Sequence, residues 1–166
     1  MSLTFNAEEI YETAALIERN GQAFYRKAAE FQQDEAGSKL LLGLAEMEVQ
    51  HEQLFLDLLK ALPEKARQPQ IWEPEGELDM YLKALADSHI FNTRQSPADL
   101  LTGQESLEDI LVKAIQFEKD SVLFYNGLAD MTPDRSGKDK VEQLAKEEMH
   151  HVNMLSSHLA AVRRAN

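Results

Sequence analysis

Apolar residues recur every three or four positions in four stretches of the chain, the spacing of one buried face on an α-helix. These stretches predict an all-α protein made of two antiparallel helical hairpins, at residues 6–62 and 106–163. The first hairpin turns near Asp34, and Pro63 stops its second helix. The stripe of the second helix is Leu41, Leu44, Glu48, His51, Phe55 and Leu58, and that of the fourth is Val141, Leu144, Glu148, His151, Leu155 and His158.

Short sequence signals mark where the helices are expected to begin. The first helix is expected to begin at Asn6, which has the side chain of a helix cap. The third is expected to begin at Ser106, with Asp109 in the position of a capping box. Thr132 followed by Pro133 predicts a turn and the start of the fourth helix, with the threonine as its cap.

Residues 63–105 differ in character from the helical stretches, because proline and glycine punctuate them repeatedly. We expect one short amphipathic helix around Leu78 to Leu85, and packing of Ile71 and Trp72 against the bundle. A connection of this length is ample to cross a bundle that is ~40 Å tall. Two hairpins joined by a long crossover are typical of ferritin-like folds, so residues 1–166 are predicted to form one ferritin-like four-helix domain.

Two Glu-x-x-His motifs stand in the apolar stripes of the second and fourth helices. The motifs are Glu48 with His51, and Glu148 with His151. Residues three positions apart lie side by side on a helix, so each motif offers a carboxylate and an imidazole to one point. The two motifs are 100 residues apart, as are other matching segments, which indicates that the chain consists of two equivalent halves.

A further glutamate interrupts the apolar face of each remaining helix. Glu18 and Glu118 each lie 30 residues before the glutamate of a motif. The midpoint of each such pair falls in the predicted turn of its hairpin, so both members should lie at one height, ~22 Å from the loop. Four carboxylates and two imidazoles would therefore meet in the middle of the bundle.

This set of side chains is what a dinuclear metal site in a four-helix bundle requires. Four ionised glutamates balance the charge of two divalent ions, whereas without metal they would repel one another and take up protons. Mixed carboxylate and imidazole ligands suit iron or manganese, while zinc usually takes fewer carboxylates. We therefore predict two iron ions, with manganese as the alternative.

Three polar residues beside the motifs have open roles. Glu147 and His150 form another Glu-x-x-His, one residue out of register with the apolar stripe. We expect them to point outward or to contact a ligand. His158 is predicted to be structural, because Leu58 stands at the equivalent position of the first half.

Tyr25 and Tyr125 each lie seven residues after a ligand glutamate, on the same helix face. At ~10 Å along the helix axis they are too distant to bind the same ions. A buried hydroxyl needs a partner, so each tyrosine either hydrogen-bonds a ligand carboxylate or packs in the core beside a water molecule.

The composition excludes several classes of function. A formal net charge of −12 argues against binding to nucleic acid or to an anionic membrane surface. The chain has no cysteine, which excludes disulfides, zinc ribbons, iron–sulfur clusters and a thiol nucleophile. Neither a signal peptide nor an apolar stretch long enough to span a membrane is visible, so we expect a cytoplasmic protein.

Together these motifs resemble the rubrerythrin group of the ferritin-like superfamily. The resemblance implies that Glu18, Glu48 and His51 serve one half of a di-iron site, and that Glu118, Glu148 and His151 serve the other. It also implies that Glu48 and Glu148 reach both ions. Rubrerythrins reduce hydrogen peroxide, and related proteins oxidise ferrous iron with oxygen or peroxide.

The chain departs from that family in ways that change the expectation. Without cysteines it has no rubredoxin domain, so electrons are expected from an external donor such as a rubredoxin-like protein. Rubrerythrins carry an extra carboxylate on the third helix, one turn from the principal glutamate. Here the residues one turn from Glu118 are Ile115 and Ser121, so that carboxylate is missing. Val49 replaces the methionine that binds haem in bacterioferritin, so no haem is expected. We expect a homodimer, as is common for such domains.

Three functions fit the predicted di-iron site. The first is a di-iron oxidoreductase that reduces peroxide or oxygen with electrons from an external donor. The second is a protein that sequesters iron and oxidises it in passing, and the third is a di-iron hydroxylase of a small organic substrate. A structural bundle without metal is the remaining alternative.

Overall fold

Four long helices make up most of the protein in the computed structural model, which describes residues 7–64, 80–81, 84, 96–132 and 137–165. No strand occurs among these residues, and the all-α prediction is confirmed. Helices of 25 to 28 residues are ~40 Å long. They are α1 (Ala7–Phe31), α2 (Glu35–Ala61), α4 (Leu107–Met131) and α5 (Lys138–Ala165).

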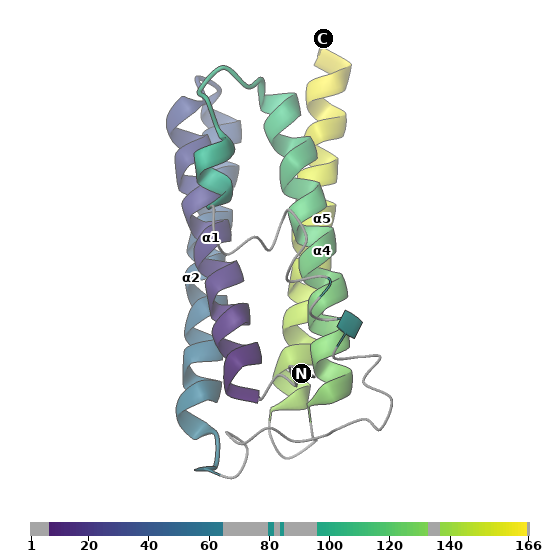
Figure 1. Cartoon of the computed structure of the whole chain (residues 1–166). Coiled ribbons are helices and arrows are strands. Elements are labelled where there is room, and N and C mark those ends of the chain that lie inside the picture. The colour runs from purple at the N-terminus through teal and green to yellow at the C-terminus, as the bar shows by residue number, and fades with distance from the viewer. Residues whose placement is uncertain (1–6, 65–79, 82–83, 85–95, 133–136, 166) are drawn as a thin grey trace.

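The helices pair as two antiparallel hairpins that lie side by side, α1 with α2 and α4 with α5 (Figure 1). Helix α2 ends at the end of the bundle where α1 begins, whereas α4 begins at the opposite end. The connection from the first hairpin to the second therefore has to traverse the length of the bundle. Just before α4, the 3-10 helix η2 (Pro97–Leu100) packs against α1. This is the connectivity predicted from the sequence.

Several expectations concern residues outside the described part of the chain. Of the short helix expected around residues 78–85, only Met80, Tyr81 and Ala84 are described, and all three are helical. Asn6, Ile71 and Trp72 lie outside the described residues.

Among the described helix ends, the signals at the end of α2 and at the start of α4 are confirmed, and one prediction is wrong. Ser106 and Asp109 form the predicted capping box at the start of α4. Thr132, however, ends α4 and does not begin the next helix, so that prediction is wrong. Its hydroxyl donates to the carbonyl of Leu128 at 2.7 Å, which occupies it within the last turn of α4. Helix α5 begins only at Lys138.

A polar layer divides the core into two apolar clusters. One cluster lies around the N-terminal half of α1 and the other around its C-terminal half, and repeat-equivalent residues fall in opposite clusters. His158 is only partly buried, and Leu159 takes the buried position beside it. None of the described helices is long and apolar enough to cross a membrane. The equivalent pairs shared between the clusters include Phe24 and Phe124, Tyr25 and Tyr125, Leu44 and Leu144, and Phe55 and Leu155.

Replacement of Gly137 by alanine is expected to destabilise the metal-free protein by about 1–2 kcal/mol. Gly137 has a φ of +99°, and an added Cβ would lie 2.5 Å from a methyl carbon of Leu58. Gly43→Ala is the matched control, because Gly43 lies in α2 with nothing within 4 Å of an added Cβ. That variant should gain roughly 0.5–1 kcal/mol. Urea unfolding measures both, and equal shifts in the two variants would contradict the analysis.

Candidate metal centre

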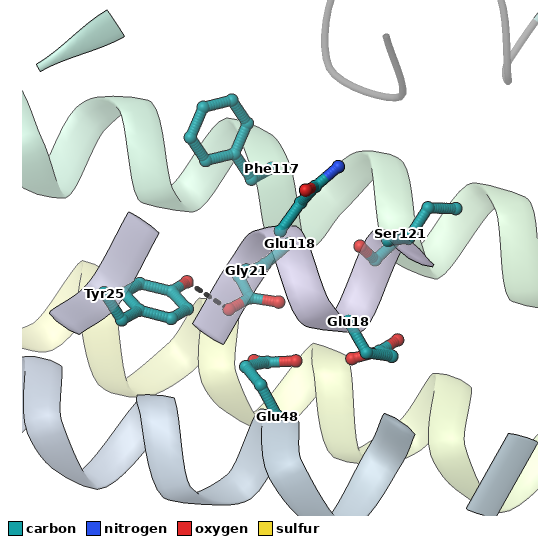
Figure 2. Close-up of a pocket in the computed structure, with 9 residues that line it drawn as sticks. Glu18, Gly21, Tyr25, Glu48, Phe117, Glu118 and Ser121 are labelled. Carbon is teal, nitrogen blue, oxygen red and sulfur yellow. Dashed lines mark hydrogen bonds between the residues drawn. The ribbon is translucent and has the colours of Figure 1, made fainter. Parts of the chain in front are cut away.

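All six predicted ligands meet at mid-height of the bundle, between the two apolar clusters. Each is at most 4 % exposed, although every one of them is ionisable. Figure 2 shows the carboxyl groups of Glu18, Glu48 and Glu118 turned toward one another. Helix α1 contributes Glu18, α2 contributes Glu48 and His51, α4 contributes Glu118, and α5 contributes Glu148 and His151.

These side chains form two overlapping groups, each able to surround one ion. In each group, one ligand atom from every member lies within 4.8 Å of the others. Glu48 and Glu148 belong to both groups, so their carboxylates can reach two ions. The first group is Glu18, Glu48, His51 and Glu148, and the second is Glu48, Glu118, Glu148 and His151.

Both imidazole rings turn the same nitrogen, Nδ1, toward the carboxylates. Nδ1 of His51 lies 3.0 Å from Glu148 Oε1, and Nδ1 of His151 lies 2.9 Å from Glu148 Oε2. The rings stack with centroids 5.3 Å apart and planes 17° from parallel. The two histidines thus face the shared glutamates from one side.

Several of the atoms that could bind a metal in this cluster lack a hydrogen-bond partner in the described structure, even though they are buried. The unpaired atoms include Oε1 of Glu48, both carboxylate oxygens of Glu148 and Nδ1 of both histidines. Some of these atoms are within ion-pair distance, but no contact between them has the geometry of a hydrogen bond. Buried polar atoms are rarely left unpaired, because each costs about 1–3 kcal/mol. Oxygen and imidazole donors in this state fit a pair of divalent metal ions.

Without metal, the surroundings of the glutamates of α1 and α4 favour the protonated form. Burial raises the pKa of both Glu18 and Glu118 well above the ordinary value, and the charges of Glu48 and Glu148 raise it further. Both carboxyl groups therefore keep their proton to a higher pH than an exposed glutamate would.

The histidines are held in the charged form by the surrounding carboxylates. Burial by itself lowers the pKa of each ring, but contacts with the ligand glutamates outweigh burial and raise the pKa of His151 to about 12. They raise the pKa of His51 as well. Burial also opposes ionisation of Glu48, yet contacts with Glu18 and both histidines hold its pKa below the ordinary range. The attraction between the charged imidazoles and the carboxylates does not require the angles of a hydrogen bond, so it acts even where that geometry is not met.

The two tyrosines hydrogen-bond carboxylates of the opposite hairpin. Tyr25 donates its hydroxyl proton to Glu118, and Tyr125 donates to Glu18 (Figure 2 shows the first of these bonds). Helical side chains lean toward the N-terminus, so a tyrosine two turns beyond the ligand level reaches back toward the centre. Of the two alternatives left open by the sequence, the structure shows the hydrogen bond.

The residues with open roles differ in how they relate to the cluster. Glu147 lies on the exposed face of α5, yet its Oε2 is 3.2 Å from Nε2 of His51. His150 is exposed and His158 partly buried, and neither joins a potential metal group among the described residues. Nothing in the sequence singled out His51 as the partner of Glu147.

A small cavity of about 30 Å³ reaches the carboxylates between α1 and α4 (Figure 2). Sequence reasoning did not identify it. A signal for it exists, because Gly21 and Ser121 are repeat equivalents that each follow a ligand glutamate by three positions. Small side chains at these two positions leave space beside the cluster. The cavity is lined by Ile17, Glu18, Asn20, Gly21, Tyr25, Glu48, Phe117, Glu118 and Ser121.

Binding of Mn²⁺ is expected to release protons and to weaken as the pH falls. The pKa values of both histidines are raised far above neutral pH, and those of Glu18 and Glu118 are raised as well, so all four groups favour the protonated form in the metal-free protein. Metal ions bind the deprotonated groups, and binding must expel these protons. Calorimetry in two buffers with different ionisation enthalpies measures the number released. Glu18→Gln should release fewer protons and exposed Glu12→Gln the same number as the original, whereas pH-independent binding would contradict the assignment.

Comparison with solved structures shows which fold these helices share. The chain is similar to a protein from Thermotoga maritima that is provisionally described as ferritin-like and diiron-carboxylate, with a crystal structure at 2.30 Å resolution. The TM-score is 0.68 at 20 % sequence identity, and the match covers 95 % of this chain and 96 % of that chain. No protein-family model matches the sequence, and no curated protein matches it significantly. The chain therefore has a ferritin-like fold, with a buried glutamate and histidine cluster at the centre of its four helices.

Proposed function

We propose that this protein is a non-haem di-iron oxidoreductase that reduces peroxide or oxygen with electrons from an external donor protein. The candidate metal ligands support iron, because they are rich in carboxylates and include two imidazoles. When bound, two ferrous ions would supply the two electrons that one O–O bond needs for its cleavage. The residues Glu18, Glu48, His51, Glu118, Glu148 and His151 would hold them.

The size of the cavity is the observation that carries the choice of substrate. A space of about 30 Å³ has room for one molecule about the size of water or hydrogen peroxide. Pockets for organic ligands usually measure about 300–1,000 Å³. The cavity therefore favours a small oxidant over an organic substrate that would be hydroxylated.

The side chains around the cavity can supply the protons of this reaction. Reduction of one hydrogen peroxide molecule to two water molecules consumes two electrons and two protons. Tyr25 lines the cavity and donates a hydrogen bond to Glu118, which lines it as well. Burial raises the pKa of the Tyr25 hydroxyl, so it remains a donor near neutral pH. Proton donors thus lie beside the place where the oxidant would bind.

We propose that a separate protein supplies the electrons. The sequence has no cysteine, so it cannot build a thiolate-bound iron centre that would pass electrons to the cluster. A small redox protein such as a rubredoxin-like donor is the partner that we propose. The expected homodimer and the cytoplasmic location stay predictions.

A mutation that fills the cavity should slow oxidation of the ferrous protein by hydrogen peroxide. Ser121 is buried at the cavity wall, and Ser121→Leu would place a branched side chain in the space. Ser121→Ala is the matched control, because it also loses the hydroxyl but keeps the space open. Stopped-flow absorbance under anaerobic conditions should show a rate on the order of tenfold lower for the leucine variant. Iron content should be equal in the two variants.

The stoichiometry of the oxidation, the iron content and the need for an organic compound separate the alternatives. We expect one hydrogen peroxide to oxidise two ferrous ions, and continued turnover when a reductant is added. Loading of many irons per protomer would favour iron sequestration, and oxidation only in the presence of an organic compound would favour a hydroxylase. Either result would contradict the proposed function.

A further inference from the structure

Among the described residues, one histidine of the cluster, His51, has a carboxylate beside its outer ring nitrogen. Nε2 of His51 points away from the ligand carboxylates and lies 3.2 Å from Oε2 of Glu147. The other carboxylate oxygen of Glu147 accepts a hydrogen bond from the side-chain amide of Gln143 at 3.1 Å. Glu147 comes from α5 and His51 from α2, so this contact joins the two hairpins beside the cluster. The carboxylate is held on both sides although it is 48 % exposed.

The other half of the repeat has no carboxylate at the corresponding place. Met47 stands where the offset of 100 residues would put the partner of His151. Its side chain is partly buried and packs against the apolar cluster around Leu44. A thioether is a weak acceptor, so Met47 cannot do for His151 what Glu147 does for His51. The pseudo-symmetry of the ligands is therefore broken just outside them.

We infer that Glu147 is a positioning residue that makes the two metal positions unequal, with the tighter position in the group that contains His51. An imidazole that binds a metal through Nδ1 carries its remaining proton on Nε2. A carboxylate that accepts this proton in a hydrogen bond fixes the tautomer and the ring orientation, and makes the ring a stronger ligand. Only His51 has such an acceptor at the repeat-equivalent position. The inference rests on the two-metal centre of the proposed function.

Because the two positions differ in affinity, the two metal ions would bind in a fixed order. The first ion would enter the group of Glu18, Glu48, His51 and Glu148, and that position would keep its ion longest. The second ion would enter the group of Glu118 and His151 and would exchange more easily. Because Glu48 and Glu148 belong to both groups, the first ion would also arrange two ligands of the second position.

Calorimetric titration with Mn²⁺ under anaerobic conditions tests this assignment without any redox reaction. The original protein should bind two ions in two steps of different affinity. Glu147→Ala should weaken the tighter step by about tenfold, at the lower end of such effects because Glu147 is half exposed, and should leave the weaker step within about twofold. Glu142→Ala is the matched control, because it removes the same charge from an exposed position of the same helix. It should change neither step.

The reciprocal variant, Met47→Glu, should strengthen the weaker step and bring the two affinities closer together. Circular dichroism checks its helix content, and if it does not fold, the comparison of the two alanine variants decides. Two equal steps in the original protein, or an equal loss in both steps for Glu147→Ala, would overturn the inference. Neither result would affect the proposed reduction of peroxide. Conversely, a protein with two unequal Mn²⁺ steps and no peroxide reduction would keep the inference and lose the proposed function.

Discussion

A carboxylate in the interior of a protein is stable only when a proton, a cation or hydrogen-bond donors neutralise it. Here that constraint falls on four glutamates at one height of a four-helix bundle, with an apolar cluster above and below them. Two histidines and two tyrosines supply part of the neutralisation, and the raised pKa values of Glu18 and Glu118 favour neutral carboxyl groups at these two positions. Several donor atoms nevertheless stay unpaired in the described structure, which is the state that two metal ions would resolve.

The same contacts hold the hairpins together. Tyr25 and Tyr125 each reach a glutamate of the opposite hairpin, and His51 of the first hairpin lies against Glu148 of the second. Each half of the repeat thus supplies groups that the other half needs. Neither hairpin alone could assemble the two groups of ligands, since Glu48 and Glu148 come from different hairpins and are shared by both.

Much of this arrangement could be predicted from the sequence, because the relevant signals are local or periodic. The apolar stripes gave the four helices, and the spacing of Glu18 from Glu48 placed both at the same height of their hairpin. Contacts that depend on how helices face one another could not be predicted. The partner of Glu147 lies on another helix. Tyr25 and Tyr125 each hydrogen-bond a glutamate of the opposite hairpin, which depends on how the two hairpins pack together. Thr132 was wrongly predicted to cap the fourth helix, because a threonine hydroxyl can hydrogen-bond the backbone of either the helix before it or the helix after it.

Diffraction from a crystal soaked anaerobically with ferrous iron would test the central claim most directly, by an anomalous difference map at the iron absorption edge. The account predicts two peaks in each protomer, one among Glu18, Glu48, His51 and Glu148 and one among Glu48, Glu118, Glu148 and His151. No peak inside the bundle, or peaks only at surface carboxylates, would contradict it.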